Sequence, residues 1–166
     1  MRSSAARIAG IVSIIAGIVF IVAGAATWAL ITSNLADQNI TVADDSPMLA
    51  GDDVNGPFSA FAEAQIINEH ALDATGGKTY AELGGEVRAA EEAGDTALAE
   101  ELQGQRTTVM NASFLRASLF TSVVSYGVAA LVIGLGVLWV LVGWALTSLG
   151  RSTVPAYAAT DRRVNV

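Results

Sequence analysis

The stretch IAGIVSIIAGIVFIVAGAATWALI, residues 8–31, decides the fold, because it contains no ionisable side chain and only two polar ones. Its 24 residues would form a helix roughly 36 Å long, which is enough to cross a hydrocarbon layer of about 30 Å. A second stretch, residues 117–150, has no charged side chain and is bounded by Arg116 and Arg151. The two stretches predict transmembrane helices at 8–31 and 117–149.

The composition of the whole chain supports a membrane protein. Of its 166 residues, 52% are hydrophobic and 15% are charged, whereas soluble domains have about 25% charged residues. The net charge of −7 leaves no basic face for a nucleic acid. Cysteine is absent and His70 is the one histidine, so the chain alone lacks the thiolate or multiple-histidine sets that zinc and iron sites use. We therefore expect no catalytic residue, metal or cofactor of its own.

The distribution of charge predicts how the chain crosses the membrane. Residues 1–7 and 150–166 contain five arginines and one aspartate. The segment between the spans, residues 32–116, contains four Lys or Arg and fifteen Asp or Glu, a net charge of −11. Because positively charged flanks remain in the cytoplasm, we expect both termini to be cytoplasmic and residues 32–116 to be extracytoplasmic. The sequence thus predicts a multi-pass protein of the plasma (inner) membrane.

The N-terminus also has the features of a cleaved signal peptide. Arg2 and Arg7 precede the apolar stretch, and Ala23-Gly24-Ala25 is a small-residue cleavage motif. The apolar stretch continues to Ile31, which is longer than the usual signal-peptide core, so a transmembrane helix is the favoured interpretation. The following segment is extracytoplasmic under either interpretation.

Small residues recur at a seven-residue step in both apolar stretches. The positions are Gly10, Gly17 and Gly24 in the first stretch and Ala129, Gly136 and Gly143 in the second. Seven residues make about two helical turns, so each set forms a stripe along one side of its helix. Small residues allow membrane helices to approach closely, and the step favours a left-handed crossing near +20°. We predict that the helices pack as a hairpin through these stripes; a second copy or another protein is the alternative partner.

Four aromatic residues and one arginine are expected at the membrane boundaries. Trp28, Tyr126 and Trp144 lie near the ends of the apolar stretches, where aromatic side chains anchor helices at the head groups, and Trp139 lies somewhat deeper. Arg116 is expected to extend toward the head groups. Its alternative is an ion pair with another subunit.

The segment 32–116 is predicted to be mostly helical after an irregular first part. One helix is expected at about 57–74 and another at about 79–103, which begins at the capping box of Thr79 and has a break at Gly94-Asp95. The Ala- and Glu-rich second helix has few large apolar residues, so we expect a solvated helix or hairpin without a core. Ser113 is a candidate cap for the second span, which is expected to run into the loop helix with little interruption.

The extracytoplasmic segment contains candidates for contact with a partner protein. These candidates are Phe58, Phe61, His70, Tyr80 and Arg116. The acidic pairs Asp44-Asp45 and Asp52-Asp53 offer oxygen ligands for Ca²⁺. However, counted from Asp52, the third position of an EF-hand loop is Val54, so solvated turns are the expected role of the acidic pairs.

Residues 40–83 (ITVADDSPMLAGDDVNGPFSAFAEAQIINEHALDATGGKTYAEL) and 112–136 (ASFLRASLFTSVVSYGVAALVIGLG) resemble a family of small two-span membrane proteins of high-GC Gram-positive bacteria. The resemblance extends to the first span but not to the termini or to the Ala/Glu-rich insert at 84–105. Members often carry the name aromatic ring-opening dioxygenase. Extradiol ring opening uses two histidines and a carboxylate on iron, which the single His70 does not supply, so the resemblance implies topology and no catalytic residue.

Together these features predict an all-α membrane protein, a two-transmembrane-helix hairpin with a mostly helical extracytoplasmic region. We expect a non-enzymatic accessory or interaction subunit of a larger membrane or envelope complex. Its partners are then the lipid bilayer and another membrane or envelope protein or a second copy of the chain. The alternatives are a subunit of a metal-dependent dioxygenase and a cation-binding sensor or transport element.

Overall fold

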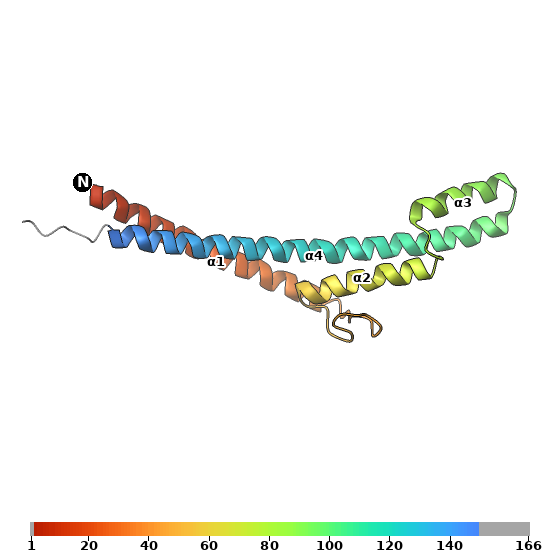
Figure 1. The fold of residues 1–166 in the computed structure, drawn as a ribbon, viewed down its shortest axis with the longest axis horizontal. Helices are drawn as coiled ribbons and strands as arrows, with labels where there is room; N and C mark the ends of the chain where they lie inside the picture. Colours follow the sequence, from red (N-terminus) through yellow and green to blue (C-terminus); the bar gives the residue numbers. More distant parts are fainter. Residues whose placement is uncertain (1, 150–166) are drawn as a thin grey trace, which may run out of the picture. The chain divides into compact units, whose positions relative to one another are not determined.

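The structure, a computed structural model, describes the backbone of residues 2–149, which contain four helices (Figure 1). The helices are α1 (Arg2–Ala36), α2 (Pro57–Asp73), α3 (Tyr80–Glu92) and α4 (Thr96–Leu149). No strand occurs in this part of the chain, and Thr41 and Asp53 form one isolated antiparallel bridge. The predicted all-α class is therefore confirmed for the described residues. The predicted tail 150–166 lies outside them.

The chain divides into two compact units. The terminal unit consists of residues 1–23 and 132–166, and the central unit consists of residues 24–131. Each unit therefore contains one part of α1 and one part of α4.

Both apolar stretches are helical, but the helices are longer than the predicted spans. The helix α4 is continuous from Thr96, so the prediction that Ser113 caps a separate helix is wrong. The hydroxyl of Ser113 donates instead to the carbonyl oxygen of Val109 at 2.8 Å, within the helix. Residues 97–116 contain no proline and a single glycine, Gly104, which costs a helix only about 1 kcal/mol. Nothing in this sequence therefore ends the helix before the second apolar stretch.

The terminal unit is built on direct contact between the backbones of α1 and α4. A Cβ atom added at Gly17 would lie 2.5 Å from the carbonyl oxygen of Gly136, and one added at Gly10 would lie 2.7 Å from that of Gly143. Moving toward the C-terminus on α1 thus means moving toward the N-terminus on α4, so the two segments run antiparallel. Ser13, which is also buried here, donates its hydroxyl to the carbonyl oxygen of Ala9 at 2.9 Å. Four of the six predicted stripe residues therefore meet in this unit.

In the central unit, Tyr126 connects α1, α4 and the loop that precedes α2. Its side chain is 1% exposed, and its hydroxyl donates to the carbonyl oxygen of Asn55 at 3.2 Å. The same hydroxyl is 2.8 Å from the hydroxyl of Thr32, and the ring meets Trp28 edge-on with centroids 4.7 Å apart. The expectation that Tyr126 faces the head groups is therefore wrong, because the chain itself covers its ring. The other two stripe residues, Gly24 and Ala129, are also buried in this unit.

The loop between α1 and α2 folds onto the same core. Val42 donates its N–H to the carbonyl oxygen of Asp52, and Val54 donates to that of Ile40, both at 2.9 Å. The side chains of Val42 and Val54 are each 1% exposed. They pack with alanines of α2 and with residues of α1 and α4, namely Leu35, Ala60, Ala62, Ala64, Leu119 and Tyr126. Since alanine has a short side chain, α2 lies close against this core.

The expectation that the Ala/Glu-rich part has no core is wrong. Six apolar residues of α3 and α4 form a second buried cluster: Leu83, Val87, Ala90, Ala99, Leu102 and Val109. The predicted break is confirmed, since Gly94 has φ +77° and Asp95 accepts the N–H of Leu98 at 3.1 Å, as a helix-capping residue does. The chain turns at this point, so α3 and the start of α4 cover each other's apolar faces.

The contact at Gly17 gives a direct test of the terminal unit. We expect Gly17→Ala to destabilise the unit by about 1–3 kcal/mol, because the added methyl group would overlap the carbonyl oxygen of Gly136. Thermal unfolding of the detergent-solubilised protein measures the effect. Gly134→Ala is the matched control, since a Cβ at Gly134 meets nothing within 4 Å. Equal melting temperatures for both variants would contradict the role of this contact.

Candidate functional site

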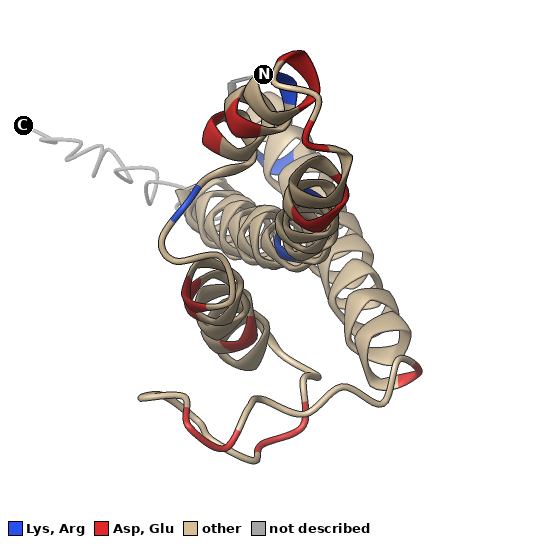
Figure 2. Ribbon diagram, turned by 90° about the vertical axis from the view of Figure 1, so that its right-hand side faces the viewer, with Lys and Arg blue, Asp and Glu red and all other residues tan. Residues whose placement is uncertain are grey.

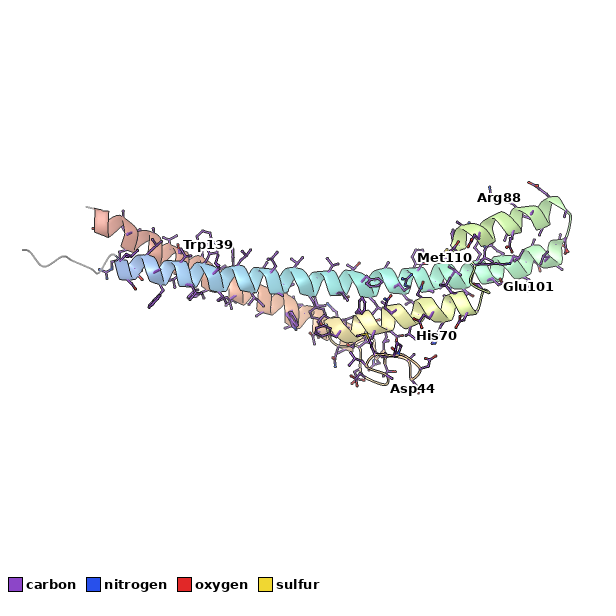
Figure 3. All side chains as sticks on the ribbon, in the orientation of Figure 1. Asp44, His70, Arg88, Glu101, Met110 and Trp139 are labelled. Carbon is purple, nitrogen blue, oxygen red and sulfur yellow. The ribbon has the colours of Figure 1, made fainter. Side chains whose placement is uncertain are left out.

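Two side-chain contacts hold the loop of residues 43–53 against α2. Glu63 accepts the N–H of Ala43 at 3.1 Å, and Nε2 of His70 lies 2.8 Å from a carboxylate oxygen of Asp45. Figure 3 labels His70 on α2 and Asp44 on the loop beside it. The side chains of His70 and Asp45 are 49% and 67% exposed, so solvent reaches this pair.

The contact between His70 and Asp45 shifts the proton affinities of both. The hydrogen bond that His70 donates to the carboxylate of Asp45 raises the pKa of His70 above its usual 6.5. The bond from His70 lowers the pKa of Asp45 below its usual 3.8. At pH values between these two, a protonated imidazole faces an ionised carboxylate. The predicted candidate His70 is therefore engaged within the chain as a pH-dependent attachment of the loop.

An apolar patch lies where this loop meets the start of α2. We define the patch as Met48, Leu49 and Phe58, whose exposed fractions are 46%, 40% and 74%. Leu49 has φ +53°, which is unusual for a residue with a side chain. Leu49 and Phe58 also line a cavity of about 460 Å³ together with Asp52 and Asp53. The patch therefore exposes large apolar side chains where the loop meets the start of α2.

The other predicted partner contacts are used inside the central unit. Phe61 meets Phe120 edge-on with centroids 6.0 Å apart. Arg116 lies over Phe120 at 5.8 Å and donates its Nε to the carbonyl oxygen of Ala64 at 3.2 Å. This bond to α2 replaces the predicted extension of Arg116 toward the head groups. Among the five predicted contacts, Phe58 is thus the most exposed large apolar side chain, at 74%.

Tyr80 at the start of α3 lies beneath the guanidinium of Arg106. The guanidinium carbon is 4.1 Å from the centre of the ring, a cation–π distance. A Cβ at Gly84 would lie 3.2 Å from Nε of Arg106, so glycine leaves room for the stacked side chain. This pairing explains why Tyr80 is only 40% exposed. No pattern in the sequence predicts this contact, because the two residues lie on different helices.

The acidic residues are spread over α2, α3, the start of α4 and the loop (Figure 2). Lys78 and Glu86 form an ion pair at 2.6 Å. Within residues 2–149, no group of three or more His, Cys, Asp or Glu side chains is arranged to hold a metal ion. The acidic pairs Asp44-Asp45 and Asp52-Asp53 are therefore not brought together with further ligands.

The largest feature missed at the sequence level is a cavity of about 590 Å³ in the central unit. Its walls come from the end of α1, the loop that follows it, α2 and α4, and include Ile31, Asn34, Gln38, Glu63, Ile67 and Leu119. The wall formed by α4 also contributes four hydroxyl side chains, Ser118, Thr121, Ser122 and Ser125. Their spacing of i, i+3, i+4 and i+7 marks one face of a helix. That spacing is the feature of the sequence that indicates this polar wall of the cavity.

Comparison with known proteins identifies no relative of this chain. The chain matches no protein-family model, no curated protein sequence and no solved structure. The resemblance to the two-span family stays a prediction.

The attachment of the loop by His70 predicts a pH dependence. Because the folded pKa of His70 is raised, its contribution is fully present below about pH 6.5 and is lost as the pH rises through the raised value. The contribution of Asp45, whose pKa is lowered, is present above about pH 3.8 and is lost as the pH falls through its folded pKa. The loop is therefore held best at pH values between the lowered pKa of Asp45 and the raised pKa of His70.

An NMR titration of the His70 ring measures this coupling. We expect a pKa above 6.5 in the native chain and a return toward 6.5 in Asp45→Asn, which removes the acceptor's charge. Asp44→Asn is the neighbouring control and leaves the bond to His70 in place. A native His70 that titrates at or below 6.5 contradicts the pairing.

Proposed function

We propose that this chain is an integral membrane protein in which α1 and α4 span the membrane as an antiparallel hairpin. In this proposal both termini are cytoplasmic and the acidic central segment is extracytoplasmic. The protein acts without catalysis, as an accessory or interaction subunit of a larger membrane or envelope complex.

The exposed apolar faces of α1 and α4 carry this proposal. Both helices are long and apolar enough to cross a membrane, and only 22% and 17% of their most apolar windows are buried. The core helix of a soluble protein is mostly buried. Here large side chains such as Ile8, Ile15, Leu131, Leu138, Leu141 and Trp144 are between 57% and 66% exposed. Lipid is the solvent in which such surfaces are stable.

The charge distribution supports the proposed orientation. The segment 32–116 has a net charge of −11, and the flanking ends contain five of the nine Lys and Arg residues. A segment with so few cations is translocated more readily than the arginine-rich ends.

The apolar patch of Met48, Leu49 and Phe58 supports a protein partner. Interfaces are enriched in Phe and Met and depleted of charge at their centres. The patch lies on a loop held by hydrogen bonds and is surrounded by an acidic segment, so a partner with an apolar groove and basic rim fits it. Another membrane or envelope protein is the proposed partner, and a second copy is the alternative.

The other candidate functions gain no specific support. A ring-opening dioxygenase subunit needs two histidines and a carboxylate on iron, and His70 has Asp45 as its neighbour without a third ligand among the described residues. A cation sensor needs several converging oxygen ligands, which the acidic pairs do not provide in the part of the chain described.

Cysteine labelling tests the topology cleanly, because the native chain has no cysteine. We expect His70→Cys to react with a membrane-impermeant maleimide in intact cells. Ser4→Cys, on the N-terminal side of the first span, is the matched control and reacts only after lysis. If position 4 is labelled in intact cells and position 70 is not, the orientation is the opposite of the proposed one. Release of the protein from membranes by alkaline carbonate contradicts the spanning helices.

The patch predicts which substitution releases the partner. We expect Phe58→Ser to reduce co-purification of the partner about tenfold or more, which is the loss expected for an aromatic interface anchor. Phe114→Ser is the control, because Phe114 is also a phenylalanine and is 66% exposed. A photo-crosslinking residue at position 58, in cells with two differently tagged copies, separates self-association from another protein. Equal recovery from both serine variants argues against the patch.

A further inference from the structure

We propose that the cavity of about 590 Å³ in the central unit binds one membrane lipid with an uncharged, hydroxyl-bearing headgroup. The inference rests on the proposed function, since it requires the spanning helices to be in a bilayer. Its volume lies within the range of about 300–1,000 Å³ that ligand pockets occupy.

The position of the cavity favours a lipid over a soluble ligand. Five of its residues belong to the uncharged stretch 117–150, namely Ser118, Leu119, Thr121, Ser122 and Ser125. Gln38 and Glu63 lie beyond the first apolar stretch, in the acidic segment. The cavity therefore extends from one predicted membrane span into the extracytoplasmic region. A lipid at the membrane boundary meets residues of both regions.

The apolar wall suits an acyl chain. It is formed by branched aliphatic side chains of α1, α2 and α4, namely Ile31, Leu35, Ile67, Leu115 and Leu119. Contacts of this kind are non-directional, so they hold a hydrocarbon chain without fixing its headgroup.

The polar groups select the headgroup. The hydroxyls of Thr121, Ser122 and Ser125 donate their hydrogens to carbonyl oxygens one turn earlier in α4, at 2.7, 3.3 and 2.7 Å. Their oxygens keep lone pairs that accept hydrogen bonds. The carboxylate of Glu63 is a further acceptor. This side of the cavity therefore matches a ligand that donates hydrogen bonds.

The amides of Asn34 and Gln38 distinguish a hydroxyl from an ammonium. Each amide both donates and accepts, as a hydroxyl does, whereas an ammonium only donates. None of the 13 lining residues, all within the described part of the chain, is Lys or Arg. An anionic headgroup would find Glu63 and no cation there, so a phosphate or fatty-acid carboxylate is disfavoured.

Native mass spectrometry of the full-length protein in an uncharged detergent tests the cavity. Three dioleoyl lipids serve as probes: a diglucosyl diacylglycerol, phosphatidylglycerol and phosphatidylethanolamine. We expect the glucosyl lipid to be retained about tenfold better than either phospholipid, which corresponds to one or two hydrogen bonds of ordinary strength. Equal retention of the three, or preference for a phospholipid, overturns the proposal.

Two variants connect the preference to the cavity. Ser122→Trp fills it and is expected to lower glucosyl-lipid retention about tenfold. Val124→Trp adds the same ring to α4 at a site that is 65% exposed and outside the lining, so it keeps native retention. The double variant Asn34→Leu and Gln38→Leu preserves side-chain size and is expected to lose the headgroup preference while lipid still binds. An unchanged preference in this double variant contradicts the assignment even if Ser122→Trp fails to fold.

Membrane extraction separates failure of the cavity from failure of the proposed function. If alkaline carbonate releases the native protein from membranes, the spanning helices fail and the lipid site fails with them. If the protein stays in the membrane but shows no lipid preference, only the lipid site fails.

Discussion

The close contact of two helix backbones at glycine is the constraint on which the terminal unit depends. In lipid, apolar burial between helices adds little, so association depends on how closely the helices approach. At Gly17 and Gly136 the space for a Cβ atom is already occupied by the other backbone. The surrounding apolar side chains can vary in shape, because they face outward, whereas these glycines have no alternative of similar size.

The central unit is organised differently, through bonds between side chains and main-chain groups. Tyr126 donates to the carbonyl of Asn55, Arg116 to that of Ala64, and Glu63 accepts the N–H of Ala43. Each bond connects two elements that are distant in the sequence. Together they place the loop and α2 beside α4 and so define both the exposed patch and the cavity.

Much of this architecture could be predicted from local sequence. Length and hydropathy predict α1 and the apolar part of α4, and the capping box at Thr79 predicts the start of α3. The second buried cluster was missed because its four larger members are divided between two helices, and its other members, Ala90 and Ala99, look unremarkable in a polar, Ala-rich segment. The prediction of a cap at Ser113 was wrong because serine caps some helices and lies within others.

The candidate sites were harder to predict than the helices. Phe58, Phe61 and Tyr80 are all aromatic residues of the central segment, and the sequence alone does not distinguish their environments. The structure shows that the ring of Phe58 is exposed, whereas Phe61 pairs with Phe120 and Tyr80 with Arg106. The large cavity requires three separated segments to converge. The hydroxyl spacing on α4 indicates a polar face, but it does not indicate what lies opposite.

The bond from Tyr126 to the carbonyl of Asn55 has a consequence for natural variation. A main-chain carbonyl is present whatever residue type occupies position 55, while a phenolic donor at position 126 is available from tyrosine alone. Substitutions at position 55 therefore leave this bond intact, and those at position 126 abolish it. Related chains that keep this architecture should share the donor and differ freely at the acceptor, so that the bond persists between proteins whose sequences have drifted apart.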